Sequence, residues 1–260
     1  MGTLTILDFA ARGDVESLKK AIDAKSDVNV VDAYRRISAL SFAATYGRAT
    51  CLQLLLDAKA NIKVKDSDKY TALMHAAQSG SADCVELLLI ARKGVSAEDP
   101  EADSALLLTA VAGHTTCLQL IVDAKADIGA KNRYCEEIAL IWAASRDHTT
   151  CAQTLLDINA STEVRNSQMR TALIIAARNG RLECTKLLVN AKANLDAQDD
   201  NGNTALILAA RNGNIACVQY LIAAKADVKV QNDKGQTALM RAIQEDRIRC
   251  VRLLVDMATW

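Results

Sequence analysis

Seven of the eight cysteines recur at an almost constant interval, and this spacing constrains the fold more than any other feature of the chain. The intervals between successive members are 33, 33, 34, 33, 33 and 33 residues. The seven residues are Cys51, Cys84, Cys117, Cys151, Cys184, Cys217 and Cys250. A fixed period of this length predicts similar units that stack in a line and bury their apolar sides against one another.

A second motif recurs with the same period and marks where each unit begins. The segment Thr71-Ala72-Leu73-Met74-His75-Ala76-Ala77 has counterparts that begin at Ser38, Ser104, Ile138, Thr171, Thr204 and Thr237. A degenerate first copy runs from about Leu4 to Gly13 and is followed by Ser17 in place of the cysteine. We therefore predict eight repeats in a single domain, at approximately residues 1–34, 35–67, 68–100, 101–134, 135–167, 168–200, 201–233 and 234–260.

Each repeat is predicted to consist of two short helices and a polar connecting segment, which we call the finger. In the third repeat, the Thr71 hydroxyl should cap a first helix over residues 72–79. Gly80 can adopt the positive φ that reverses the chain before a second helix at about residues 82–91. The polar segment 96–101 should then form the finger that leads to the fourth repeat.

This unit resembles the ankyrin repeat. In that family, Thr-Pro-Leu-His-x-Ala-Ala is followed by Gly, a Leu-rich second helix and Gly-Ala-Asp-Val-Asn. The seventh repeat has Thr204-Ala205-Leu206-Ile207-Leu208-Ala209-Ala210, then Gly213, Leu221-Ile222 and Ala226-Asp227-Val228. The resemblance implies an all-α solenoid of helix-turn-helix units joined by β-hairpin-like fingers. It also implies a concave face built from first helices and fingers, with partner binding as the usual role.

The sequence departs from the family pattern at the end of the second helix, where the usual glycine is replaced. The replacing residues are Lys25, Lys59, Arg92, Lys125, Asn159, Lys192 and Lys225. If they keep the left-handed backbone that glycine favours there, each should cost roughly 1 kcal/mol. The cysteine early in the second helix is similar to that of ankyrin-only proteins of some protists.

The in-phase cysteines could be interpreted as a metal or redox array, or as small core residues. Equivalent positions on stacked helices lie about 8–10 Å apart, whereas a disulfide needs Cα atoms within about 7 Å. Zinc ligands must converge on one ion, and the chain contains no Cys-x-x-Cys pair. We therefore assign the seven cysteines to the core and predict no metal or cofactor. Cys135, in the fifth finger, should be an exposed thiol.

The charge balance argues against nucleic acids and membranes as partners. The chain has 31 Lys plus Arg and 31 Asp plus Glu, so it generates no long-range field of one sign. The basic residues that end the second helices are neutralised locally by Asp side chains such as Asp57 and Asp127. No apolar run approaches the roughly 18 residues that cross a bilayer, and the N-terminus lacks a secretory signal pattern. We expect a cytoplasmic protein, or a nuclear one, that is monomeric alone.

Most aromatic residues and several arginines fall on fingers or on the outward side of first helices, where the family binds partners. Aromatics and Arg dominate the energetics of protein interfaces. The predicted partner-binding residues are Tyr34, Arg35, Arg36, Phe42, Tyr46, Tyr70, His75, Tyr134, Trp142, Arg146, Arg178, Arg211 and Arg241. An aromatic N-terminal half and an arginine-lined C-terminal half would suit a partner with apolar anchors beside acidic residues. The alternative is that Phe42 and Trp142 only fill gaps between first helices.

The terminal repeats should carry polar outer faces, because the ends of a stack otherwise expose its core. In the first repeat, Lys19 and Lys20 replace apolar residues. The last repeat contains Arg241, Arg249 and Arg252, so it is also expected to act as a cap.

No catalytic arrangement can be derived from the chain, because the three histidines and the eligible nucleophiles fall on separate repeats. We predict a non-enzymatic scaffold or adaptor that binds a protein through its concave face and fingers. The alternative is a regulatory or inhibitory subunit that occludes the active site of a partner enzyme. An activity assay on the co-purified partner would separate the two.

Overall fold

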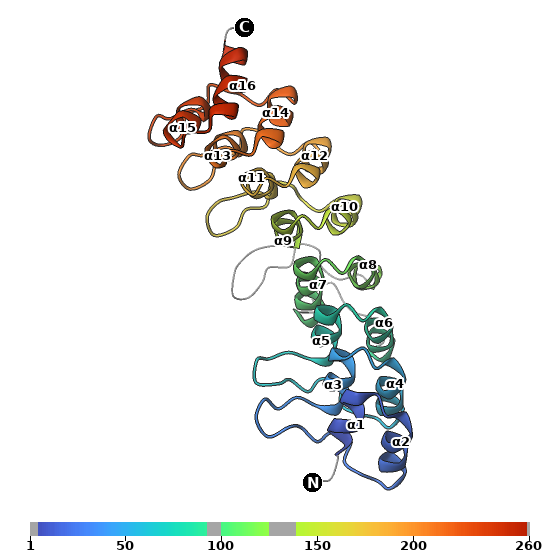
Figure 1. The fold of residues 1–260 in the computed structure, drawn as a ribbon. Coiled ribbons are helices and arrows are strands. Elements are labelled where there is room, and N and C mark those ends of the chain that lie inside the picture. The colour runs from blue at the N-terminus through green and yellow to red at the C-terminus, as the bar shows by residue number, and fades with distance from the viewer. Residues whose placement is uncertain (1–4, 93–99, 125–138, 259–260) are drawn as a thin grey trace. The chain divides into compact units, whose positions relative to one another are not determined.

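The computed structural model describes residues 5–92, 100–124 and 139–258, in which helices follow one another in pairs (Figure 1). The chain divides into two compact units, Met1–Ala130 and Lys131–Trp260, and each unit is described by itself. The division lies close to the predicted boundary between the fourth and fifth repeats.

All regular elements in the described residues are helices, as predicted. The first unit contains α1 (Ile6–Arg12), α2 (Val15–Asp23), α3 (Ala39–Thr45), α4 (Ala49–Asp57), α5 (Ala72–Ser79), α6 (Ala82–Ala91), α7 (Pro100–Ala112) and α8 (Thr115–Asp123). The second unit contains α9 (Ala139–Arg146), α10 (Thr149–Asp157), α11 (Ala172–Arg178), α12 (Leu182–Asn190), α13 (Ala205–Asn212), α14 (Ile215–Ala223), α15 (Ala238–Gln244) and α16 (Ile248–Ala258). One isolated antiparallel bridge, between Val31 and Ser38, crosses the first finger.

Within each unit the helices form two layers. Odd-numbered helices are the first helices of the repeats and pack on one another, as α11 does on α9 and α13. Even-numbered helices are the second helices of the repeats and pack on one another in the same way, as α12 does on α10 and α14. The two helices of one repeat also pack on each other, as α11 does on α12. The fingers extend from the side of the first helices (Figure 1). The described fingers comprise residues 24–38, 58–71, 158–171, 191–204 and 224–237. We call these fingers, with the adjoining side of the first helices, the finger face.

The small residues of the motif explain how tightly the layers pack. In α11, every residue from Ala172 to Ala177 is buried, because this helix touches α9, α12 and α13. Alanine is the best helix former and lets neighbouring backbones approach closely. In α12, Cys184 and Leu188 are fully buried at i, i+4 spacing. All seven in-phase cysteines are buried, which confirms their assignment to the core. Cys135 lies outside the described residues.

A residue with positive φ reverses the chain between the two helices of a repeat. Gly80 has φ 77° at this point, as predicted, and Asp147 takes the same role in the fifth repeat with φ 65°. The residue that follows can reach back to the preceding repeat. Nδ2 of Asn214 donates to the carbonyl oxygen of Ala177 at 2.9 Å. The same oxygen also accepts a hydrogen bond from the backbone N–H of Gly180 at 3.2 Å. The bond from Asn214 adds a link between neighbouring repeats.

Most of the described second helices are followed by a residue other than glycine that adopts the left-handed conformation, which is the case in which we expect a cost in stability. These residues are Lys25, Lys59, Asn159, Lys192 and Lys225, with φ between 61° and 69°. Arg92 is an exception: its φ is −77°, and its guanidinium pairs with Glu101 at 2.6 Å. Lys125 lies outside the described residues.

Lys225→Gly should raise the free energy of unfolding by about 0.5–1 kcal/mol, because glycine has no Cβ to oppose a left-handed backbone. Lys225 has φ 69° and is exposed, so the substitution leaves the core intact. Lys229→Gly is the matched control, since Lys229 is also exposed but has no positive φ. Urea unfolding of both variants measures the difference. A Lys225→Gly protein no more stable than the parent would contradict the proposed backbone strain.

Two first helices of the first unit begin differently from the prediction. Thr71 has the backbone conformation of a cap, but its buried Oγ1 forms no hydrogen bond in the part of the chain that the structure describes. By contrast, Thr204 accepts a hydrogen bond from the backbone N–H of Ile207 at 3.2 Å. Helix α7 begins at Pro100, inside the segment predicted as a finger, because proline suits the first position of a helix. Ser104 therefore lies within the helix.

The last repeat is less polar than predicted. Arg249 and Arg252 are exposed, but so are several apolar side chains. The exposed apolar residues are Met240, Ile243, Ile248 and Val255, at 42–59% of their maximal area. The prediction of a polar C-terminal cap is therefore wrong in part. At the other end, Lys19 and Lys20 are exposed, as predicted.

Candidate functional site

One Asp or Asn side chain closes each described finger. In the finger between α12 and α13, Oδ1 of Asp199 accepts hydrogen bonds from the backbone N–H groups of Asn201 at 3.0 Å and Asn203 at 2.9 Å. Three other fingers are closed in the same way by Asp66, Asn166 and Asn232. Asp32 closes the longer first finger through similar bonds. Turns of this kind fix each tip by its own side chain.

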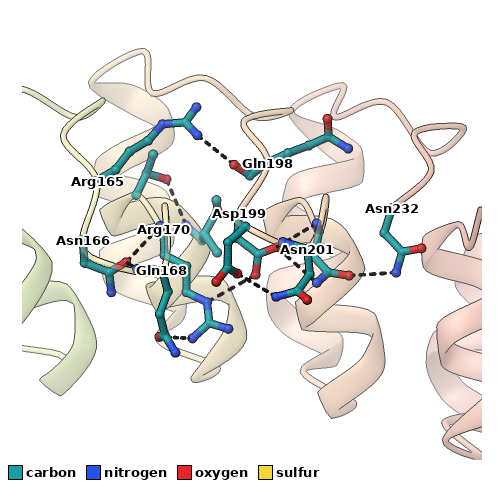
Figure 2. A network of polar contacts seen from close by, with 12 residues as sticks. Arg165, Asn166, Gln168, Arg170, Gln198, Asp199, Asn201 and Asn232 are labelled. Carbon is teal, nitrogen blue, oxygen red and sulfur yellow. Dashed lines mark hydrogen bonds and ion pairs between the residues drawn. The ribbon is translucent and has the colours of Figure 1, made fainter. Parts of the chain in front are cut away.

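The fingers of the second unit are also bonded to one another (Figure 2). The backbone N–H of Asp200 donates to the carbonyl oxygen of Gln168 on the preceding finger at 3.2 Å. Nη1 of Arg165 donates to the carbonyl oxygen of Gln198 at 2.8 Å. Because the tips are closed and joined, side chains that project from them are held in place before any partner arrives.

A buried carboxylate positions one arginine between these fingers. Nε of Arg170 lies 3.3 Å from Oδ2 of Asp199, and Nη1 of Arg170 donates to Oε1 of Gln168 at 2.6 Å (Figure 2). The Asp199 side chain is completely buried and that of Arg170 is 14% exposed. The guanidinium is therefore fixed from two sides, with a small part of it open to solvent.

In the first unit, the predicted partner-binding residue Phe42 lies on α3, and Tyr46 lies at the C-cap of the same helix. Their rings are stacked, with centroids 6.5 Å apart. Phe42 is half-buried, whereas Tyr46 is 55% exposed. Tyr34, at the tip of the first finger, is 94% exposed. Phe42 thus partly fills the space between helices, as the alternative interpretation states, while Tyr34 and Tyr46 are open to a partner.

The two predicted arginines of the first finger have different surroundings. Nη2 of Arg35 pairs with Oδ2 of Asp68 on the next finger at 2.6 Å, and both side chains are exposed. Arg36 is exposed, has φ 57°, and forms no ion pair within the described ranges. An exposed ion pair contributes little to stability, so Arg35 can exchange Asp68 for an acid of a partner at little cost.

His75 and Tyr70 are directed toward the interior of the first unit. His75 is buried, and its Nε2 lies 2.9 Å from Oδ2 of Asp66. Tyr70 is half-buried, with its ring centroid 5.6 Å from that of His75. Since Asp66 also closes the second finger, His75 supports this finger from within. This position corrects the expectation that His75 faces the binding surface.

In the second unit, Trp142 and Arg146 lie one helical turn apart on α9. The guanidinium carbon of Arg146 is 5.7 Å from the centroid of the Trp142 ring, which is a cation–π arrangement. Trp142 is half-buried, and its Nε1 has no hydrogen-bond partner in the described structure. Part of this ring therefore fills space between helices, as with Phe42. The predicted residue Tyr134 lies outside the described residues.

The three predicted arginines near the C-terminus differ in how much of their charge is already paired. Arg178 and Arg211 occupy equivalent positions on α11 and α13, and both are exposed. Arg211 contacts Glu245 at 3.5 Å, and Arg241, only 13% exposed, contacts the same carboxylate at 3.1 Å. Partial burial lowers the pKa of Arg178, and the charges of Arg170 and Arg211 lower it further. These guanidinium groups are therefore close enough to repel one another.

A hollow of about 230 Å³ lies beside these arginines in the second unit, between two fingers and the helices α13 and α15. Its lining includes Arg211 and Arg241 from the predicted set. It also includes Arg170 and Lys234, which are absent from that set. Arg170 directly precedes the Thr171 cap, and a side chain at this point of the motif emerges beside the finger. This fixed position in the repeat is the signal that could have identified it.

The thiols of the core have no features of a reactive site. Burial is the largest of the effects that raise the pKa of Cys117 to about 11 and that of Cys184 to about 12, so both remain protonated at neutral pH. Among the residues that the structure describes, no group of three or more His, Cys, Asp or Glu side chains could hold a metal ion. None of the described helices combines the length and apolar character that spanning a membrane requires.

Comparison with known protein families agrees with the repeated helix pairs. The family model described as ankyrin repeats (3 copies) matches residues 7–99, 106–199 and 191–259. A search for similar sequences among curated proteins found no match. The three matched segments together cover most of the chain and overlap every helix of both units. The chain therefore belongs to the ankyrin-repeat family.

Proposed function

We propose that the chain is a protein-interaction module that binds a partner protein non-covalently through its finger face. Ankyrin repeats are generally protein–protein interaction modules. The observation that carries the proposal is the gathering of exposed aromatic and arginine side chains on this face. Tyr34 and Tyr46 represent it in the first unit, and Arg178 and Arg211 represent it in the second.

The residue types on the finger face favour binding on energetic grounds. Tyrosine and arginine are enriched among the few residues that supply most of the binding energy at interfaces. Exposed tyrosine rings such as Tyr34 lose unfavourable contact with water when a partner covers them. The closed and bonded fingers lower the entropy that is lost on binding, because their tips are already ordered. An interface of standard size, about 800 Å² on each partner, would cover several repeats.

Capture of partners from a lysate of the source cell tests the proposed function. The full chain should retain a set of proteins that Tyr34→Ala/Tyr46→Ala loses, with about a tenfold or greater fall in capture for each protein, since two exposed anchors are removed. Lys186→Ala/Arg249→Ala is the control, because Lys186 lies on α12 and Arg249 lies on α16, away from the finger face. It should capture the same proteins as the parent.

The comparison among the three proteins decides the outcome. Proteins that the parent and the control retain, and that the tyrosine variant loses, support binding by the finger face. Equal capture by all three proteins would show that binding occurs elsewhere. Circular dichroism of each variant checks that the helices are intact.

A further inference from the structure

The hollow in the second unit is more positive than the chain as a whole. Among the described side chains that line it, Arg170, Arg211, Lys234 and Arg241 are cations, and Asp233 is the single carboxylate. The whole chain has equal numbers of acidic and basic residues. The positive excess is therefore local to this part of the finger face, where it attracts anions.

Acids of the protein itself hold two of these arginines. Arg170 binds the buried carboxylate of Asp199 at 3.3 Å, and Arg241 binds Glu245 at 3.1 Å. Their side chains are only 14% and 13% exposed. These two guanidinium groups therefore form fixed walls of the hollow and have few free N–H donors left to bind a ligand.

Arg211 and its neighbour Arg178 retain most of their hydrogen-bonding capacity. Within the described residues, the Arg211 guanidinium has one polar contact, at 3.5 Å from Nε to Glu245, an acid that Arg241 holds more closely. The Arg178 guanidinium has no polar partner within the described ranges. A guanidinium carries five N–H donors in a plane, and this geometry matches the two oxygens of a carboxylate. Two exposed groups of this kind, one repeat apart, are available to an anionic ligand.

The other walls of the hollow are less suited to neutral or apolar ligands. Nδ2 of Asn232 donates to Oδ1 of Asn203 at 3.0 Å, so these amides are occupied within the protein. Leu208 is the only apolar residue among the described lining residues, and it is 2% exposed. Apart from the aliphatic stems of its arginine and lysine side chains, the described lining therefore offers charged and polar groups. Repulsion among Arg170, Arg178 and Arg211 adds to this preference, because a bound anion would relieve it.

We propose that this hollow, together with Arg178 beside it, binds an acidic segment of the partner protein, with Asp or Glu carboxylates held by Arg178 and Arg211. The inference rests on the proposed function and specifies its ligand in the second unit. A peptide fits better than a nucleic acid, since a polyphosphate needs a continuous row of cations. Here Asp233 interrupts the wall, and Asp200 lies exposed on the neighbouring finger.

Selection from a random peptide library, with the full chain as bait, tests the proposal. Selected peptides should be enriched in Asp and Glu. A dye-labelled selected peptide should bind Arg178→Gln/Arg211→Gln at least about tenfold more weakly than the parent, because the paired charges are lost. Lys186→Gln/Arg249→Gln is the control, because it removes the same number of positive charges from second helices. Its affinity for the peptide should lie within about twofold of that of the parent, since salt screens charges that are distant from the hollow.

Each alternative outcome has a definite meaning. Selected peptides without acidic enrichment, or equal binding by the two variants, would overturn the inference. Tighter binding of single-stranded RNA or of a phosphoserine peptide at the same arginines would overturn it in favour of phosphate recognition. None of these results bears on the proposed function itself, which the capture experiment with Tyr34→Ala/Tyr46→Ala decides in the other unit.

Discussion

Asp199→Ala should lower the free energy of unfolding by about 3 kcal/mol. Alanine cannot accept the hydrogen bonds that Oδ1 of Asp199 receives from the backbone N–H groups of Asn201 and Asn203. The substitution also deprives Arg170 of the buried carboxylate that it binds at 3.3 Å. Nδ2 of Asn203 also loses its bond to Oδ1 of Asp199, at 3.2 Å. Each buried polar group left unpaired costs about 1–3 kcal/mol, so the loss of four contacts at one position has a large effect for a finger residue.

Asp199→Asn should cost only about 1 kcal/mol, because an amide oxygen can accept the same backbone bonds. Asn166 and Asn232 already do so at the equivalent positions. Asp200→Ala is the matched control, since Asp200 is the exposed neighbour. Urea unfolding compares the three stabilities, and hydrogen exchange at the Asn201 amide shows whether the finger has opened. Equal losses for the Asn and Ala variants would mean that the finger depends on the charge of Asp199 and that backbone closure contributes little.

In the folded protein, Cys184 should react with iodoacetamide at least roughly a thousandfold more slowly than an ordinary cysteine at about pH 8. Burial is the main cause that raises the pKa of this thiol from 9.0 to about 12, and the carboxylate of Asp147 adds to it. A rise of this size lowers the thiolate fraction about a thousandfold, and the thiolate is the nucleophile. The side chain is also closed to the reagent, because Cys184 is 0% exposed.

Mass spectrometry of the Cys184 peptide after timed labelling measures this rate. The same reaction in concentrated denaturant gives the rate of the unprotected thiol. Asp147→Asn supplies a sharper comparison, since asparagine tolerates the φ of 65° at this position. Removal of the charge should lower the pKa of Cys184 and speed its labelling. Similar rates in the folded and denatured chain would contradict the assignment of the in-phase cysteines to the core.

The pairing and layering of the helices follow from the sequence because one packing rule is repeated in every unit. A cysteine such as Cys184 can be buried at the same point of successive repeats only if every helix pair stacks alike. Lys225 adopts positive φ because its place in the repeat demands it, whatever its side chain. Arg92 does not: its φ is −77°, and its guanidinium pairs with Glu101, a contact that the repeat pattern does not specify. Helix α7 also begins earlier than the repeat pattern predicts, at Pro100.

The candidate site could be predicted by residue type and helix position, but its burial could not. Arg178 and Arg211 are exposed, as their places on the first helices suggest. His75 also lies on a first helix, yet Asp66 of the preceding finger binds it in the interior. The hollow depends on contacts such as that between Arg211 and Glu245, which lie in different repeats. The repeat period contains no information about such pairs. Only the structure therefore shows that Arg170 and Arg241 are held by acids of the protein, whereas Arg178 and Arg211 are exposed.

The way the fingers are closed has a consequence for how the protein can change in length. Asn166 and Asp199 each close their own finger by accepting hydrogen bonds from nearby backbone N–H groups. If the chain is joined anew at equivalent positions of two successive fingers, the resulting finger therefore still contains a side chain that closes it. A block such as residues 167–199 could therefore be deleted or duplicated in frame. Gene duplication, or a protein engineer, could thus lengthen or shorten the binding surface by whole repeats without inventing a new turn.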